Sequence, residues 1–179
     1  MTLQWLSLLM LAGLLVAAVV SDVRSRRIPN ALVVYGAALG LLFQALAPAG
    51  SGLLLDGGVG LPAALLGGLA GLGLFLPFYA LRLMGAGDVK LLAMVGIWLG
   101  APAILKVALW TALAGGVLSV VVALFTGQLR QVLRNTFFML AAVRPAQGVG
   151  SHLAAGTRLP YAVAIATGTA LEMARLLSA

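Results

Sequence analysis

The sequence predicts an all-α, polytopic membrane protein with about six transmembrane helices, one of them short. Hydrophobic residues make up 63% of the 179 residues and charged residues 8%, whereas a soluble domain draws about 25% of its residues from the four charged types. The mean hydropathy is +1.14, and the apolar residues run in blocks that rival the thickness of a bilayer. No internal repeat or change in composition divides the chain, so residues 1–179 are expected to form a single membrane domain.

The first apolar block covers residues 3–20. As a helix it would measure about 27 Å, at about 1.5 Å per residue, which is enough to cross a membrane. A secretory signal peptide carries its positive charges before its apolar segment, but here Arg24, Arg26 and Arg27 follow the block. Because basic residues favour the cytoplasmic side, we expect the N-terminus outside the cytoplasm and the three arginines inside.

The next two apolar blocks cross the membrane in alternating directions. Residues 31–47 are apolar and lead into a loop that is rich in turn formers and contains Asp56 but no basic residue, which favours a periplasmic position. Residues 61–81 then lead back to Arg82, on the cytoplasmic side. This third block is rich in glycine, which lets neighbouring helices approach closely.

A short block follows at residues 87–100. Its helix would measure about 21 Å, less than the hydrocarbon thickness of about 30 Å, so its start is expected in a recess or a thinned part of the membrane. Ala101-Pro102 is expected to separate it from the fifth block, residues 103–125. The short block either spans the membrane or dips back as a re-entrant segment.

The positions of the remaining basic residues favour the spanning alternative. If the short block spans, the four arginines between residues 126 and 158 are cytoplasmic, as the positive-inside rule prefers. The last span is then residues 159–177, and both termini are periplasmic. Before it, Arg130 and Arg134 stand four apart among leucines and phenylalanines, a pattern typical of a helix that lies in the cytoplasmic interface.

The formal net charge of +7 comes from 11 basic and 4 acidic residues. The basic residues lie between apolar blocks, where they orient the chain and contact anionic lipid headgroups, so we expect no nucleic-acid partner. The absence of cysteine excludes disulfides, thiolate zinc sites and a cysteine nucleophile, and the single histidine, His152, leaves no histidine cluster for a metal. Neither a metal nor another cofactor is expected.

Two acidic residues, Asp22 and Asp88, are expected at the same cytoplasmic end of the apolar blocks. Ionisable groups in such positions usually face a protein interior or a water-filled cavity and carry function. Two carboxyls that lie close together share one proton, so one can take a proton from water while the other donates to a peptide carbonyl. Gly85 and Gly87 just before Asp88 allow another chain to approach closely.

Three segments of the chain carry a family resemblance: SDVRSRRIPN at 21–30, MGAGDVKLLA at 84–93 and LPYAVAIATG at 159–168. In this order they resemble the type IV prepilin peptidase family of GxGD membrane aspartic proteases. The resemblance implies an endopeptidase that removes the short basic leader from prepilins or pseudopilins at the cytoplasmic face of the bacterial inner membrane. It also implies Asp22 and Asp88 as the catalytic pair. The supporting positions that it implies are Pro29, Asn30, Gly85, Gly87 and Lys90.

The chain departs from the larger, bifunctional members of that family. Those members add an N-terminal cytoplasmic segment with paired cysteines and an N-methyltransferase activity, whereas this chain has no cysteine and its first apolar block begins at residue 3. It therefore resembles the short, peptidase-only type that serves Flp/Tad pilus systems, and we expect no N-methylation.

The acid pair has other possible roles besides catalysis. Asp22 could be a solvated helix-end acid beside arginines, and Asp88 an acid favoured by the dipole at a helix N-terminus. A proton-coupled transporter would place its acids near the midplane, often in paired repeats, but here both are expected at one face and no repeat is visible. A non-catalytic scaffold for a secretion machine would make both acids dispensable.

The remaining polar residues have simpler expected roles. Glu172 and Arg175 stand three apart and are expected to pair on the last span. Lys106, near the periplasmic end of the fifth span, can extend its ammonium to the interface. Tyr161 is expected as an interfacial anchor, and the family resemblance adds packing near the active site, which is compatible with anchoring. His152 is expected as a loop residue.

Overall fold

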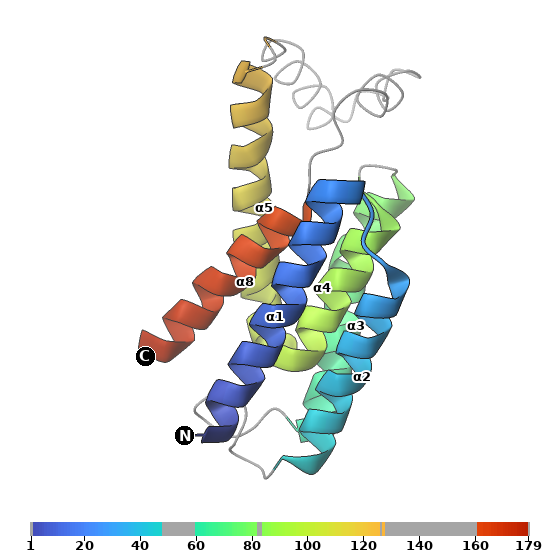
Figure 1. Cartoon of the computed structure of the whole chain (residues 1–179), viewed down its shortest axis with the longest axis vertical. Helices are drawn as coiled ribbons and strands as arrows, with labels where there is room; N and C mark the ends of the chain where they lie inside the picture. Colours follow the sequence, from blue (N-terminus) through green and yellow to red (C-terminus); the bar gives the residue numbers. More distant parts are fainter. Residues whose placement is uncertain (1, 48–59, 82–83, 126, 128–160, 179) are drawn as a thin grey trace.

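The computed structural model describes residues 2–47, 60–81, 84–125, 127 and 161–178, and these residues form six α-helices and no strand. The all-α prediction is therefore confirmed for this part of the chain (Figure 1). The helices are α1 (Thr2–Ser25), α2 (Asn30–Leu46), α3 (Gly60–Ala80), α4 (Ala86–Leu99), α5 (Ala101–Phe125) and α8 (Tyr161–Ser178).

Three of the described helices are long and apolar enough to cross a membrane. These are α3, α5 and the part of α1 from Trp5 to Ser25, and α2 is a shorter apolar helix. Many of their large apolar side chains are exposed to the surroundings, including Leu9 and Val16 of α1 and Leu69 of α3. Such a surface suits lipid rather than water, so the protein is a polytopic membrane protein.

Successive helices run in alternating directions through the bundle (Figure 1). The ends of α1, α3 and α5 lie at one end, which we call the upper end as drawn, and both chain termini lie toward the other. The α4 helix runs from the upper end to the lower end, and α5 returns, so the short block crosses the bundle instead of turning back. This course matches the spanning alternative.

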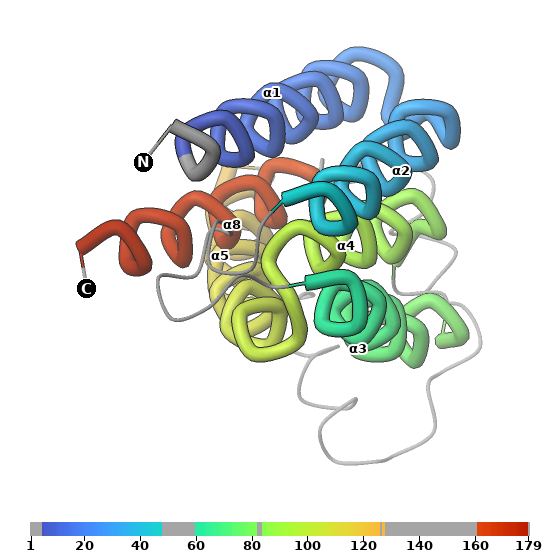
Figure 2. Tube along the Cα trace, turned by 90° about the horizontal axis from the view of Figure 1, so that it is seen from below, coloured from blue at the N-terminus to red at the C-terminus, as the bar shows by residue number. Residues whose placement is uncertain are grey.

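The short α4 helix lies at the centre of the bundle. It packs against α1, α2, α3, α5 and α8, and these helices surround it in the view along the bundle (Figure 2). Eight of its 14 residues are buried. A helix that is apolar on all sides belongs in such a core. Its limited length is tolerated because longer helices, not lipid, cover it.

Polar groups fasten α2 to α4 inside this core. The indole Nε1 of Trp98 donates to the backbone oxygen of Gly36 at 3.0 Å, and Nε2 of Gln44 donates to the backbone oxygen of Trp98 at 3.2 Å. Both side chains are buried. Buried polar groups are tolerated when they are hydrogen-bonded, as these are.

The backbones of α3 and α4 approach each other closely. A Cβ atom on Gly67 would collide with the backbone oxygen of Gly96, and a Cβ on Gly96 would collide with the backbone oxygen of Gly67. A Cβ on Gly71 would lie 2.6 Å from the backbone oxygen of Leu92. The glycines expected to permit close helix approach therefore do so at this interface.

Most of the described helix ends lie one residue from the expected limit, and two larger differences have a physical cause. The first helix continues five residues beyond the apolar block to Ser25, which places Asp22 inside α1. It ends because Arg26 adopts a left-handed conformation, φ 54°, while its N–H still bonds the Asp22 backbone oxygen at 2.8 Å. The α5 helix begins at Ala101, because Pro102 fits the first turn, where no N–H donor is needed.

The expected interfacial helix lies outside the described residues, as do Asp56, Arg82 and His152.

Candidate active site

Three helix ends meet at the upper end of the bundle: the end of α1 and the starts of α4 and α8 (Figure 1). Asp22, in the last turn of α1, is only 7% exposed. Its Oδ2 accepts a hydrogen bond from the backbone N–H of Ala162 at 3.1 Å. Ala162 is the second residue of α8, so the Asp22 carboxylate caps the N-terminus of that helix, where the helix dipole favours a negative charge.

Asp88 occupies the first turn of α4 and is half-buried. Its Oδ2 accepts a hydrogen bond from the backbone N–H of Gly85 at 3.2 Å, which satisfies one donor at the start of α4. The carboxyl of Asp88 also interacts electrostatically with Asp22 and with Tyr161. The structure therefore brings together two carboxyls that are far apart in the sequence.

The turn between α1 and α2 is fastened to the start of α4. A Cβ on Gly87 would lie 3.2 Å from the Cβ of Ile28, so the absence of a side chain lets the turn pack on α4. On the exposed side, Nζ of Lys90 donates to Oδ1 of Asn30 at 3.1 Å. Pro29 precedes α2 in an extended conformation, φ −62° and ψ 130°. Of the positions expected to support the site, Pro29 and Asn30 thus lie at the start of α2, and Gly87 and Lys90 contact this turn from the start of α4.

Tyr161, the first residue of α8, packs beside the carboxyls. Its ring contacts Phe75 of α3 edge to face, with centroids 6.2 Å apart, and the side chain is half-buried. Of the two expected roles for Tyr161, the structure shows the packing near the acid pair. Sequence reasoning missed the backbone donor of Ala162 and the contact with Phe75, because a backbone N–H leaves no trace in the residue type.

The charge around the site is mostly positive. Arg24, Arg26 and Arg27 follow Asp22 and are exposed, as is Lys90. Within the described residues, no group of three or more His, Cys, Asp or Glu side chains is placed to hold a metal ion. The site as described therefore offers one buried and one half-buried carboxyl, an arrangement suited to transferring protons to and from a bound substrate.

Comparison with known proteins gives a family. The model of the type IV leader peptidase family matches residues 9–120, which include both aspartates but end before α8. No curated protein and no solved structure matches the chain. Since the matched residues make up more than half of the sequence, the chain belongs to the type IV leader peptidase family.

Proposed function

We propose that this protein is a membrane-embedded aspartic endopeptidase, with Asp22 and Asp88 as its catalytic pair, that removes the leader peptide from Flp-type prepilins or pseudopilins. Membership of the family supports leader peptidase activity in general. The observation that carries the aspartic assignment is the meeting of Asp22 and Asp88 at one end of the bundle, where each accepts a backbone hydrogen bond and the two interact electrostatically.

The proposed reaction is a direct hydrolysis. Of the two carboxyls, one is ionised and the other protonated, because two close carboxylates cannot both ionise easily. The ionised carboxyl takes a proton from water, the water oxygen attacks the scissile carbonyl carbon, and the protonated carboxyl donates its proton to the carbonyl oxygen. As the gem-diol collapses, the carboxyl that is now ionised takes a proton from one of its hydroxyls, the C–N bond breaks, and the other carboxyl donates its proton to the leaving amine. The pair thereby returns to its starting protonation state. No covalent enzyme intermediate forms.

The different exposure of the carboxyls suits a substrate that approaches from one side. Asp22 is buried against α8, whereas Asp88 is half-buried and follows Gly85, which is exposed and extended, φ −76° and ψ 148°. A substrate backbone can lie beside such a segment without meeting a side chain. The exposed arginines after Asp22 support a cytoplasmic position for this end in the bacterial inner membrane.

This orientation predicts the sides on which two loop positions lie. The chain has no cysteine, so Asp56→Cys and Arg82→Cys each introduce a single thiol. In intact spheroplasts, a membrane-impermeant maleimide is expected to label position 56 only, and position 82 should react after lysis. The cysteine-free parent controls for background. Labelling of both positions from the same side would contradict the proposed topology.

The Lys90–Asn30 hydrogen bond predicts a moderate effect on catalysis. Lys90→Met and Asn30→Ala are each expected to lower kcat/KM about two- to tenfold, as loss of one hydrogen bond of about 0.5–1.5 kcal/mol implies. The double variant should be little worse than either single variant, because both remove the same contact. Arg24→Met, which removes another exposed positive charge that follows Asp22, is the matched control. Fully additive losses would exclude a shared role.

Processing of a prepilin tests the function directly. The protein is co-expressed with a Flp-type prepilin in a bacterium that lacks its own prepilin peptidases, and the prepilin is followed by immunoblot and by N-terminal sequencing. We expect a shortened pilin only when the protein is present. An uncleaved prepilin beside a correctly inserted protein would contradict the proposal. Equal processing of prepilins from other type IV systems would contradict the Flp preference alone.

A further inference from the structure

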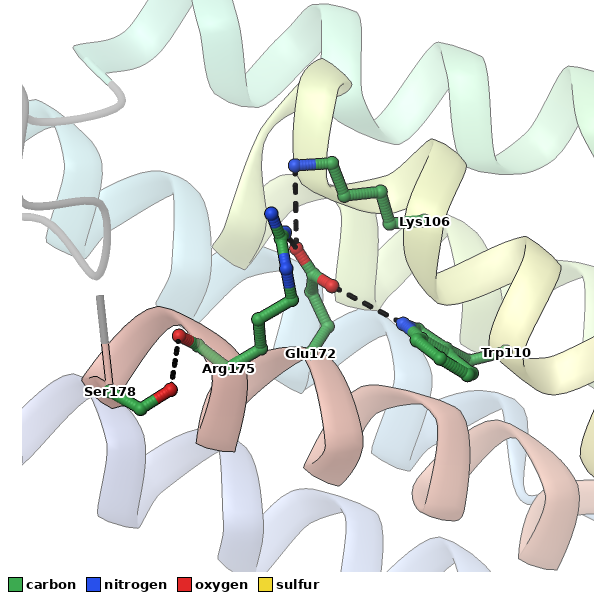
Figure 3. A network of polar contacts seen from close by, with 5 residues as sticks. All are labelled: Lys106, Trp110, Glu172, Arg175 and Ser178. Atoms are coloured by element: carbon green, nitrogen blue, oxygen red, sulfur yellow. Dashed lines mark hydrogen bonds and ion pairs between the residues drawn. The ribbon is translucent and has the colours of Figure 1, made fainter.

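A buried carboxylate that the proposed reaction does not use lies on α8, ten residues along the helix from Ala162. The Glu172 side chain is 1% exposed. Its Oε1 lies 3.1 Å from Nη1 of Arg175 and 3.8 Å from Nζ of Lys106, and its Oε2 accepts a hydrogen bond from the indole of Trp110 at 3.4 Å (Figure 3). The expected Glu172–Arg175 pair is therefore present, within a larger network. A buried carboxylate requires such partners.

This network joins two helices. Arg175 is on α8 with Glu172, whereas Lys106 and Trp110 extend from α5 (Figure 3). Both cationic side chains are about half exposed, at 54% for Arg175 and 49% for Lys106. Since Glu172 is the buried member, α8 cannot slide along α5 without withdrawing the carboxylate from Lys106 and Trp110.

Two further contacts set the same register between α5 and α8. A Cβ on Gly168 would lie 2.6 Å from Oγ1 of Thr111, and a Cβ on Gly115 would lie 2.9 Å from the ring of Tyr161. The Tyr161 ring, Gly168 and Glu172 thus contact α5 at successive levels of α8. A shift by one residue would move α8 by about 1.5 Å and disrupt all three contacts.

The register of α8 matters because its first turn holds Asp22. The Ala162 N–H lies 3.1 Å from the Asp22 carboxylate, and a shift of about 1.5 Å would exceed hydrogen-bonding distance. We propose that Glu172 is a positioning residue, whose contacts with Lys106 and Trp110 set the register of α8 on α5 and thereby hold the Ala162 N–H on Asp22. The role of Asp22 in this inference rests on the proposed function.

The first test separates positioning from general stability. Glu172→Gln keeps the size of the side chain and an acceptor for Trp110 but removes the charge that holds Lys106. We expect kcat per inserted molecule to fall at least about fivefold while KM changes less than about twofold, because substrate binding is not altered. Glu172→Asp should retain at least half of the kcat that Glu172→Gln loses, since the flexible side chain of Lys106 can reach the shorter carboxylate. Thr167→Ala is the matched control, because Thr167 is exposed on the same helix and its hydroxyl bonds the backbone oxygen of Val163 within that helix.

The second test does not depend on catalysis. The chain has no cysteine, so Ala162→Cys introduces a single thiol at the start of α8. Ala162 is fully buried, so this thiol is shielded while α8 keeps its register. A small neutral thiol reagent should label this cysteine slowly in the Ala162→Cys variant. In the double variant Ala162→Cys, Glu172→Gln, labelling should be at least about fivefold faster. If Glu172→Gln does not accumulate in the membrane, Lys106→Gln takes its place in both tests. Lys106→Gln should then lower kcat and speed the labelling of position 162, each to a smaller degree.

Unchanged kcat together with unchanged labelling would overturn the positioning role. A faster labelling with unchanged kcat would also overturn it, because the register of α8 would then not govern Asp22. Failure of the proposed function gives a different result, since either the wild type would then not cleave or Asp22→Asn would still permit cleavage. The labelling of position 162 reports the register of α8 in every case.

Discussion

Replacing Asp22 or Asp88 with asparagine is expected to abolish leader removal, with kcat falling about 10²- to 10⁴-fold, the range that general acid–base catalysis contributes. Each substitution removes a group that must gain or lose a proton, and neither partner can replace it. The fold should persist, because the asparagine Oδ1 can still accept the N–H of Ala162 or of Gly85. Combining both substitutions should add little, since the two groups act as a unit.

The measurement is the processed fraction of a co-expressed prepilin, normalised to the amount of inserted protein. Asp56→Asn removes an acid far along the chain from both aspartates and is the matched control, with wild-type processing expected. Retained cleavage in either Asp22→Asn or Asp88→Asn would refute the two-aspartate assignment. Retained cleavage in both would point to another catalytic group, whereas a transporter or a scaffold would show no cleavage even in the wild type.

A second large effect is expected at the contact between α3 and α4. Gly67→Val would push a branched side chain into the backbone of Gly96 and Gly100, which cannot yield as a flexible side chain can. Overpacking typically costs about 1–3 kcal/mol, and a clash with backbone should lie at or above the upper end of that range. We expect a clear fall in Tm in detergent or a failure to accumulate, and a loss of activity, because α4 carries Asp88.

The same helix supplies the control for this prediction. A Cβ on Gly73 would meet nothing within 4 Å, so Gly73→Val is expected to change Tm little. Both substitutions have the same effect on local helix propensity, so the difference in Tm between the two variants reports the effect of packing between α3 and α4. Equal Tm values for the two variants would show that the close approach of α3 to α4 is not needed for stability.

Much of the fold could be predicted from local patterns. The apolar blocks predicted the described helices to within a few residues, because lipid requires each span to satisfy its own backbone hydrogen bonds in a helix. The largest differences arose at α1 and α5. Polar residues after the apolar block continue α1 as far as Ser25, and Pro102 lies in the first turn of α5 instead of separating it from α4. Both differences concern helix ends, where capping and turn geometry decide at which residue a helix begins or ends.

The candidate site was predictable in its residue types but not in its geometry. The placement of the basic residues predicted Asp22 and Asp88 at the same membrane face, and the resemblance implied that they form a catalytic pair. The burial of Asp22, its bond to the Ala162 N–H and the packing of Ile28 on Gly87 had no sequence signal. These contacts join residues that are far apart in the chain, and their formation depends on how whole helices pack.

Composition and hydropathy alone therefore established a membrane protein made of helices, because these properties depend on the transfer of each segment from water to lipid. The placement of the basic residues added the prediction that the two aspartates lie toward one face. Tertiary packing decided the rest. It made the shortest of the described helices the centre of the bundle, brought α8 onto Asp22 and placed Glu172 against Lys106. Close packing of side chains and backbones selects those arrangements, and no single segment contains that information.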